Sequence, residues 1–203
     1  MIDMGFQEFK DDYLKATAPE ERINILNSVR NLSDNSDLSF FSTQYKQESD
    51  GKVRAEIINF ISRNFANDSS SILIDALTDN SIETRKMAVK ALGRGQKFSS
   101  IKPLLEMLSN PSLEIRGEVF KSVVNIGRIG NLNEILECYE KENIHVKRSI
   151  PNILGKIQNE DSMNILKELL HKKDPEVRRN AIRALEKLLH PKDARLVINL
   201  IPL

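Results

Sequence analysis

The chain has 203 residues, of which 40% are hydrophobic and 29% are charged, a composition typical of a folded globular protein and not of a disordered one. A single cysteine, Cys138, excludes a disulfide framework and a cysteine-based zinc site, and it fits the reducing environment of the cytoplasm. The net charge of +1 hides an asymmetry, because residues 1–80 carry 8 Lys and Arg against 14 Asp and Glu, whereas residues 81–203 carry 22 against 15.

The N-terminal residues 1–8 are acidic and lack an apolar core, so they do not resemble a signal peptide. No apolar run approaches the ~18 residues that a membrane-spanning helix needs. Tryptophan is absent and aromatic residues make up only 5%, which argues against a surface that stacks nucleic-acid bases. We therefore expect a cytoplasmic protein that does not associate with a membrane.

Further along the chain the sequence repeats every 31 residues. An apolar or β-branched residue followed by a base recurs in five copies, and a sixth copy at Glu21-Arg22 is one residue out of phase. A good helix N-cap residue stands four positions before each of the five bases. Each copy therefore begins a helix, called a B helix below, and a shorter amphipathic A helix precedes it. The five bases, called the register bases, are Arg54, Arg85, Arg116, Lys147 and Arg178, and their N-caps are Asp50, Ser81, Ser112, Asn143 and Asp174.

One helix pair of this size cannot fold alone, because ordering 31 residues costs roughly 45 kcal/mol and a single apolar stripe does not offset that. Stacked pairs bury their stripes against each other and share one continuous core. We therefore predict an all-α fold, a right-handed α-solenoid of stacked antiparallel helix pairs, with about six 31-residue repeats plus a terminal helix. Residues 1–203 would form a single domain, with irregular repeats over 1–49, regular repeats over 50–189 and the terminal helix over 193–203.

The repeat resembles HEAT repeats, and its short length is most similar to the HEAT-like class named after phycobilisome lyases. The resemblance rests on Asp174-Pro175-Glu176-Val177-Arg178-Arg179-Asn180-Ala181-Ile182-Arg183-Ala184-Leu185, and nearly as well on residues 80–93. It implies that the B helices line the concave side of the solenoid and that the register bases pair with acids of adjacent repeats. The resemblance is specific for the fold and nearly silent on function, because such folds serve scaffolds, nucleic-acid binders and a few enzymes.

The sequence offers no catalytic or metal-binding pattern. The three histidines, His145, His171 and His190, have no Glu or Asp beside them, so the iron-binding His-Glu pairs of HEAT-like hydroxylases are absent. No zinc motif and no phosphate-binding glycine loop is present. The glycines near Arg94 and Arg128 are interpreted as left-handed helix C-caps, and Cys138 as a core residue. We expect no enzyme activity, no cofactor, no metal and no catalytic residue.

Two irregularities interrupt the pattern. Pro151 lies inside the fifth B helix, where we predict a kink or a break that is either a tolerated irregularity in a curved stack, or a hinge or a notch for a partner. Gly117 in the fourth B helix is either a neutral substitution or a point of close approach to a ligand. The terminal helix either caps the solenoid or docks its apolar side on a second copy or another protein.

The main functional signal lies on the B-helix positions that the apolar stripe leaves in water. Positions +1, +5 and +9 from the register base share one face. Of these 15 residues, 10 are Lys or Arg and none is acidic, whereas the average frequency of Lys and Arg, 30 in 203, would give about two. Glu56 and Glu118 in the neighbouring column dilute this charge, and the A helices are acidic. The predicted partner-binding residues are Arg63, Lys86, Lys90, Arg94, Lys121, Arg148, Lys156, Arg179, Arg183 and Lys187.

A solvated face without a ligand would also explain these columns, because bases near a helix C-terminus interact favourably with the helix dipole. With a ligand, the columns favour a scaffold or adaptor that holds an acidic segment of another protein in a basic concave groove. The first alternative is nucleic-acid backbone binding, which the near-zero net charge and the scarcity of aromatics disfavour. The second alternative is an accessory subunit of a lyase-like enzyme.

Overall fold

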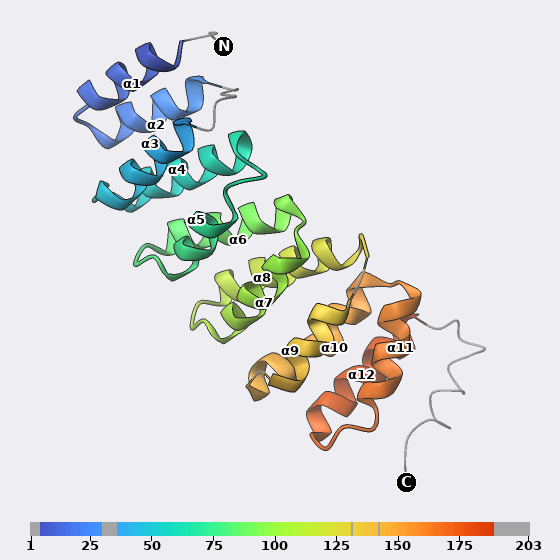
Figure 1. Ribbon diagram of the computed structural model, residues 1–203. Helices are drawn as coiled ribbons and strands as arrows, with labels where there is room; N and C mark the ends of the chain where they lie inside the picture. The colour runs from blue at the N-terminus through green and yellow to red at the C-terminus, as the bar shows by residue number, and fades with distance from the viewer. Residues whose placement is uncertain (1–4, 30–35, 131, 142, 189–203) are drawn as a thin grey trace. The chain divides into compact units, whose positions relative to one another are not determined.

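The computed structural model describes residues 5–29, 36–130, 132–141 and 143–188, and throughout this part of the chain the regular structure is helical (Figure 1). The chain divides into two compact units, Met1–Gly95 and Gln96–Leu203, each described by itself below. The predicted single solenoid over 1–203 stays a prediction, and the predicted terminal helix over 193–203 lies outside the described residues.

The N-terminal unit contains three antiparallel helix pairs in its described residues (Figure 1). Arg22 lies in the second helix of the first pair, which confirms the sixth copy of the repeat at Glu21-Arg22. The pairs are α1 (Phe6–Lys15) with α2 (Pro19–Ser28), α3 (Ser36–Gln47) with α4 (Gly51–Asn64), and α5 (Ser70–Asp75), extended by the 3-10 turn η1 (Ala76–Thr78), with α6 (Ile82–Gly95).

The C-terminal unit contains three further pairs in its described residues. In the first pair a short A helix lies between two 3-10 turns, as the short predicted A helices would suggest. The elements are η2 (Phe98–Ser100), α7 (Ile101–Glu106), η3 (Met107–Ser109) and α8 (Leu113–Gly127), then α9 (Asn133–Lys141) with α10 (Ile144–Ile157), and α11 (Glu160–Leu169) with α12 (Pro175–Leu188).

The B helices begin where the sequence predicts. Asp50 accepts hydrogen bonds from the amides of Lys52 and Val53, and Asn143 accepts them from the amides of His145 and Val146. The side chains of Ser81, Ser112 and Asp174 each accept one from the amide three residues on. These bonds satisfy the amides that the first helical turn leaves without a partner.

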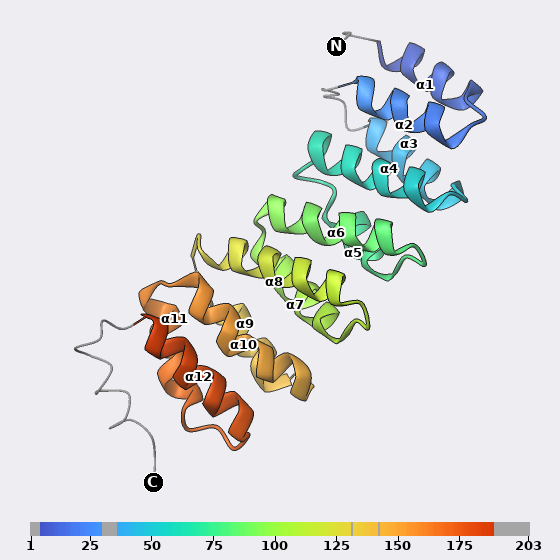
Figure 2. The same cartoon turned by 180° about the vertical axis from the view of Figure 1, so that it is seen from behind.

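The apolar positions of the repeat form the cores. The A-helix residues in register, Leu73, Leu104, Ile135 and Leu166, are all buried, and Cys138 is buried beside them as predicted. B helices of consecutive repeats pack against each other within each unit, α4 on α6 and α10 on α12 (Figure 2). At Gly155 of α10 an added methyl group would lie 2.8 Å from Cβ of Ala184 in α12, so these two helices approach closely because Gly155 has no side chain.

The predicted break at Pro151 and the predicted glycine C-caps were wrong. Helix α10 continues from Ile144 to Ile157 with Pro151 buried inside it, so the helix does not break there, and the kink stays a prediction. The described glycines do not adopt the left-handed conformation, which instead occurs at Gln96 (φ 51°) and Gln158 (φ 63°), directly after α6 and α10. Polar residues therefore end these helices in the role that glycine usually takes.

Candidate functional site

The register bases hold the repeats together from within. Arg85 donates to the carbonyls of Asp79 and Asn80, and Arg116 donates to those of Asn110 and Pro111, so each guanidinium binds the turn between its own A and B helices. Arg178 makes the same pair of bonds five and six residues back, and Arg54 binds the carbonyls of Glu48 and Ser49. Even the irregular copy follows the rule, because Arg22 Nε donates to the carbonyl of Ala16.

The expectation that the register bases pair with acids of adjacent repeats is correct for only part of the set. Arg54 forms a two-pronged ion pair with Asp79, with Nε–Oδ2 and Nη2–Oδ1 distances of 2.9 Å, and Arg22 binds Glu48 at 2.6 Å. Arg85, Arg116 and Arg178 bind backbone carbonyls instead, because the turn of their own repeat lies within reach of the guanidinium. These bases are structural, as the sequence suggested.

A buried polar cluster surrounds Asp79 in the N-terminal unit. The Tyr45 hydroxyl donates to Asp79 Oδ2 at 2.8 Å, and the Arg54 side chain is only 10% exposed. Hydrogen bonds from Arg54, the Ser81 amide and Tyr45 outweigh the effect of burial and lower the pKa of Asp79. Burial and the bond to this carboxylate raise the pKa of Tyr45. The cluster is satisfied internally and fixes α4 against the turn before α6.

In the N-terminal unit the predicted site residues Arg63, Lys86, Lys90 and Arg94 lie on the packed helices α4 and α6. Arg63 is 3.4 Å from Glu56, which confirms that this carboxylate dilutes the basic column. Arg94 Nη2 donates to Asn59 Oδ1 at 3.1 Å and to the Ser62 hydroxyl at 2.9 Å, across the two helices. Burial, and then the nearby charge of Arg63, lower the pKa of Arg94. Both arginines are therefore engaged with neighbouring side chains.

In the C-terminal unit three predicted site residues, Lys121, Arg148 and Arg179, have carboxylate partners. Lys121 is 3.4 Å from Glu118, although its side chain remains 74% exposed. Arg179 pairs with Glu176 one turn away on α12, at 2.6 Å. These pairs lie at the surface, where each contributes little to stability and leaves the cation accessible.

The Arg148–Asp174 pair is different because it joins two repeats. Arg148 on α10 binds Asp174 at 2.8 Å through Nη2, and Asp174 at the same time caps α12 through the Val177 amide. The hydrogen bond from Arg148 is the main cause that lowers the pKa of Asp174 to about 2. Asn180 of α12 completes the connection by donating to the carbonyl of Arg148 at 2.9 Å. Arg148 is thus partly a structural residue, a role that helical spacing alone did not indicate.

The remaining three predicted residues, Lys156, Arg183 and Lys187, are exposed, and their side chains make no hydrogen bond or ion pair with any residue in the described ranges. Arg128, which the sequence analysis did not include, joins them: its Nη2 donates to the carbonyl of Lys156 at 3.2 Å and so places a cation at the end of α10. We call Arg128, Lys156, Arg183 and Lys187 the basic cluster. A base directly after a predicted helix end was the signal available for Arg128.

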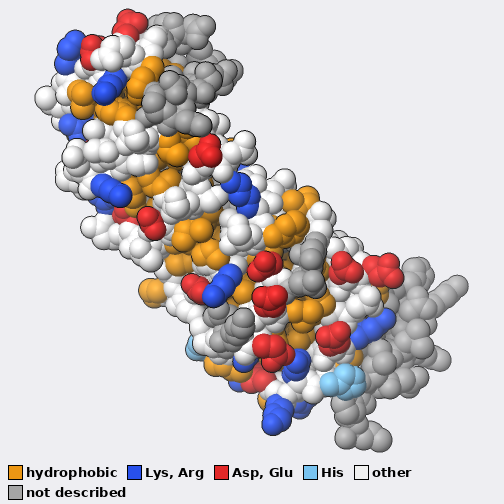
Figure 3. All heavy atoms as spheres, in the orientation of Figure 1, with side chains coloured by type: hydrophobic (Ala, Val, Ile, Leu, Met, Phe, Trp, Pro, Cys, Tyr) orange, Lys and Arg blue, Asp and Glu red, His pale blue; other side chains and the backbone are white. Residues whose placement is uncertain are grey.

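The basic cluster is held by the close packing of α10 on α12. Lys156 follows Gly155 in the chain and Arg183 precedes Ala184, and Gly155 and Ala184 are in close contact between the two helices. The A helices of this unit carry several carboxylates, and Figure 3 shows carboxylates over α9 and α11 with Lys and Arg side chains among them.

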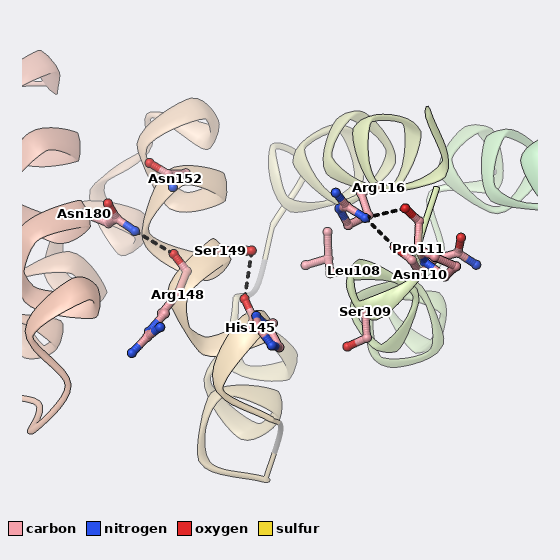
Figure 4. Close-up of a pocket in the computed structure, with 10 residues that line it drawn as sticks. All are labelled: Leu108, Ser109, Asn110, Pro111, Arg116, His145, Arg148, Ser149, Asn152 and Asn180. Atoms are coloured by element: carbon pink, nitrogen blue, oxygen red, sulfur yellow. Dashed lines mark hydrogen bonds between the residues drawn. The ribbon is translucent and has the colours of Figure 1, made fainter. Parts of the chain in front are cut away.

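A cleft of about 550 Å³ opens beside α10 in the C-terminal unit (Figure 4). Ser149 and His145 project from α10 towards the wall that α8 and η3 form, while Arg116 is directed to the turn that it binds. Asn152, one of the amide members of the +5 column, contributes to the lining together with Asn180. The lining is mixed, because the amide and hydroxyl groups of Asn152, Asn180 and Ser149 share the cleft with the apolar side chains of Leu108 and Pro111.

No group of acidic, histidine and cysteine side chains that could hold a metal ion occurs among the residues that the structure describes. In the same residues no helix has both the length and the apolar character needed to cross a lipid bilayer. No atom of the protein lies within 4 Å of the position that a Cβ at Gly117 would take, so packing within the chain does not require a glycine there, and both readings of Gly117 stay predictions.

The chain was compared with protein families, curated proteins and solved structures. A family model of HEAT repeats matches residues 70–143 and 132–201. No curated protein matches the chain. Among solved structures, a designed armadillo repeat protein is 18% identical, covering 87% of this chain and 97% of its own with a TM-score of 0.49, and an engineered protein is 17% identical, covering 91% and 97% with a TM-score of 0.47. A designed armadillo repeat protein in complex with the peptide (KR)4 is 17% identical over 87% and 97%, with a TM-score of 0.46.

Proposed function

The chain belongs to the HEAT-repeat family, whose fold is typical of protein-binding solenoids, and from this premise we propose that it is a non-catalytic, cytoplasmic scaffold that binds an acidic segment of another protein. The surface for this segment is the basic B-helix face of the C-terminal unit. The observation that carries the proposal is the basic cluster, whose Lys156, Arg183 and Lys187 side chains are exposed and not neutralised by any described residue.

Charge supports this proposal over a purely structural role. Arginines with a structural role have partners within the protein: Arg54 pairs with the Asp79 carboxylate, and Arg116 donates to the carbonyl of Asn110. The basic cluster instead brings four positive charges to the ends of three helices, where their self-repulsion costs free energy unless an anion is bound. An acidic polypeptide segment would gain from these charges and from the amides of the adjoining cleft.

A charge-reversal series tests the proposal. The probe is a fluorescein-labelled peptide of twelve residues rich in Glu and Asp, titrated with the whole chain at 50 and 200 mM salt. We expect saturable binding that weakens with salt, because exposed charges are screened. The triple variant Lys156→Glu, Arg183→Glu, Lys187→Glu should lose at least ~30-fold in affinity, about 2 kcal/mol.

The matched control reverses three bases elsewhere on the same unit, Lys102→Glu, Lys167→Glu and Lys173→Glu, and has the same net charge. Equal loss in both variants would mean that the peptide senses only overall charge, and the proposed surface would be wrong. Nucleic-acid binding, the competing function, is measured with a labelled random duplex and single strand under the same conditions. Tighter binding of these strands than of the acidic peptide, lost in the first variant alone, would replace the scaffold by a nucleic-acid binder.

A further inference from the structure

The B helices of the C-terminal unit present exposed apolar residues at their first position. Leu113 begins α8 with 77% of its surface exposed, and Ile144 begins α10 with 39% exposed. Pro175, also exposed, begins α12, and Ile82 stands at the same position of α6 in the other unit. Leu113 and Ile144 are two of the four most exposed large apolar side chains in the described ranges. All these residues precede the register base by three, a position that is apolar in the last four B helices and is Gly51 in α4. We call Leu113, Ile144 and Pro175 the apolar row.

The apolar row shares a face with the basic columns. Positions four apart on a helix lie one above the other. Leu113 is followed at this spacing by Gly117 and Lys121, Ile144 by Arg148 and Asn152, and Pro175 by Arg179 and Arg183. From the first to the third member is eight residues, or about 12 Å along each helix. The face is therefore apolar at the helix N-termini and basic towards their C-termini.

The middle of this face carries little net charge. Gly117 has no side chain, Arg148 is paired with Asp174, and Arg179 is paired with Glu176. Towards the C-terminal ends of α10 and α12 the face is positively charged, because Lys156, Arg183 and Lys187 have no carboxylate partner among the described residues. A ligand that matches this surface has an apolar side and an acidic side separated by about the width of one helix.

From this arrangement we infer that the partner segment is an amphipathic α-helix, acidic on one flank, that lies across α8, α10 and α12; the inference rests on the proposed function. A helix with its side chains is about 10–12 Å in diameter, which equals the separation between the apolar row and the +5 column. Neighbouring packed helices lie 8–10 Å apart. On the partner helix, residues i and i+7 lie about 10.5 Å apart along the axis, so residues spaced by seven would contact successive B helices.

The apolar row also separates the two classes of ligand. A phosphate backbone has no apolar surface to bury, so a nucleic acid would gain nothing from Leu113 and Ile144. When the apolar stripe of a helix packs on this row, both surfaces lose contact with water, and binding becomes more favourable in proportion to the apolar area buried. The segment 189–203 of the chain itself contains one carboxylate, Asp193, against Lys192 and Arg195, and so it lacks the acidic flank that the surface requires.

Two synthetic peptides of identical composition test the inference. Both have 21 residues and contain Leu, Glu and Ala; in the first the leucines occupy i, i+3, i+4 and i+7 positions with the glutamates on the adjoining flank. In the second the same leucines are distributed around the helix. Circular dichroism establishes that both are equally helical, and fluorescence anisotropy measures binding to the whole chain. We expect the first peptide to bind at least tenfold more tightly.

Equal affinity of the two peptides would overturn the amphipathic helix while leaving the acidic-segment scaffold intact, whereas failure of both and of the acidic peptide above would remove the proposed function itself. The double variant Leu113→Ser, Ile144→Ser should bind the first peptide about tenfold more weakly and bind the second peptide with unchanged affinity. Leu14→Ser is the control, since Leu14 is 56% exposed on α1, outside the row. All three substituted residues are exposed, so an unchanged melting temperature is expected for each variant; an affinity that survives the double substitution would also overturn the inference.

Discussion

The N-terminal and C-terminal units build the same repeat from different cores. In the N-terminal unit Phe9, Phe41 and Phe60 are fully buried and in contact, with ring centroids 4.5 Å apart for Phe41 and Phe60. The C-terminal unit uses aliphatic residues, such as Ile135 and Leu166, at its buried positions. Aromatic rings fill more volume per residue than aliphatic side chains do, so the N-terminal unit fills its core with fewer large residues.

The two units also differ in how their inter-repeat ion pairs are buried. Arg54–Asp79 and Arg148–Asp174 each connect a B helix with the start of the next one, 25 and 26 residues further along the chain. The Arg54 side chain is 10% exposed, whereas that of Arg148 is 41% exposed. An ion pair between consecutive repeats is therefore a core element in one unit and a surface element in the other.

Removal of one partner from each pair should give the largest contrast. Arg54→Met leaves the Asp79 carboxylate buried without its partner, and we expect a loss of about 3 kcal/mol in the free energy of unfolding. Arg148→Met exposes Asp174 to water, so its loss should be much smaller. Urea unfolding, with hydrogen exchange followed separately over 5–95 and 96–188, measures both. Equal losses would show that the difference in burial has no energetic consequence.

Two glycines in the C-terminal unit form the next contrast. An alanine methyl at position 155 would lie 2.8 Å from Ala184 Cβ, so Gly155→Ala should destabilise the unit by about 1–3 kcal/mol. Gly117 has nothing within 4 Å, and Gly117→Ala should instead stabilise it by about 0.5–1 kcal/mol. Thermal unfolding of the two variants measures the opposite signs. A stabilising Gly155→Ala would contradict the close packing of α10 on α12.

Two tyrosines of the N-terminal unit differ in a single hydrogen bond. The Tyr13 hydroxyl is buried without a partner among the described residues, and burial raises its pKa to about 12. The hydroxyl of Tyr45 donates to Asp79. We expect Tyr45→Phe to cost about 1 kcal/mol and Tyr13→Phe to be neutral or slightly stabilising. Urea midpoints of both variants check this, and a clear loss in Tyr13→Phe would reveal a partner for that hydroxyl.

The smallest expected effect is a pH dependence in the C-terminal unit. Because the folded pKa of Asp174 is about 2, below its ordinary value near 3.8, the contribution of its ion pair is complete above pH ~4 and is lost as the pH falls towards 2. The melting temperatures of the wild type and Asp174→Asn should therefore converge over this range. A difference that persists unchanged to pH 2 would contradict the lowered pKa.

The repeat made much of the fold predictable from the sequence. The N-caps, the buried A-helix positions and the copy at Arg22 all follow from local spacing, since helix termini and amphipathic faces are set within one or two turns. Gln96 and Gln158 were not predicted as left-handed residues, because the sequence pattern pointed to the glycines nearby. Pro151, where a kink or a break was predicted, lies inside a helix that does not break there.

The candidate site was only partly predictable. The spacing identified ten bases on one helical face, but partners 25 to 35 residues away decide which of them remain available. Arg94 reaches Asn59, Arg148 reaches Asp174, and Arg128 joins the basic cluster through the end of α10. The apolar row was visible in the sequence as the first residue of α8, α10 and α12, but its exposure became evident only with the structure.

The sequence by itself therefore determined the helices, their boundaries and the 31-residue repeat, because these depend on interactions between residues a few positions apart. Only the tertiary structure decided which cations are neutralised, how deeply each ion pair is buried and which apolar side chains remain in water. These properties depend on how closely helices from different repeats approach, and the distance of that approach is set by side chains such as Gly155 and Ala184 that are far apart in the chain.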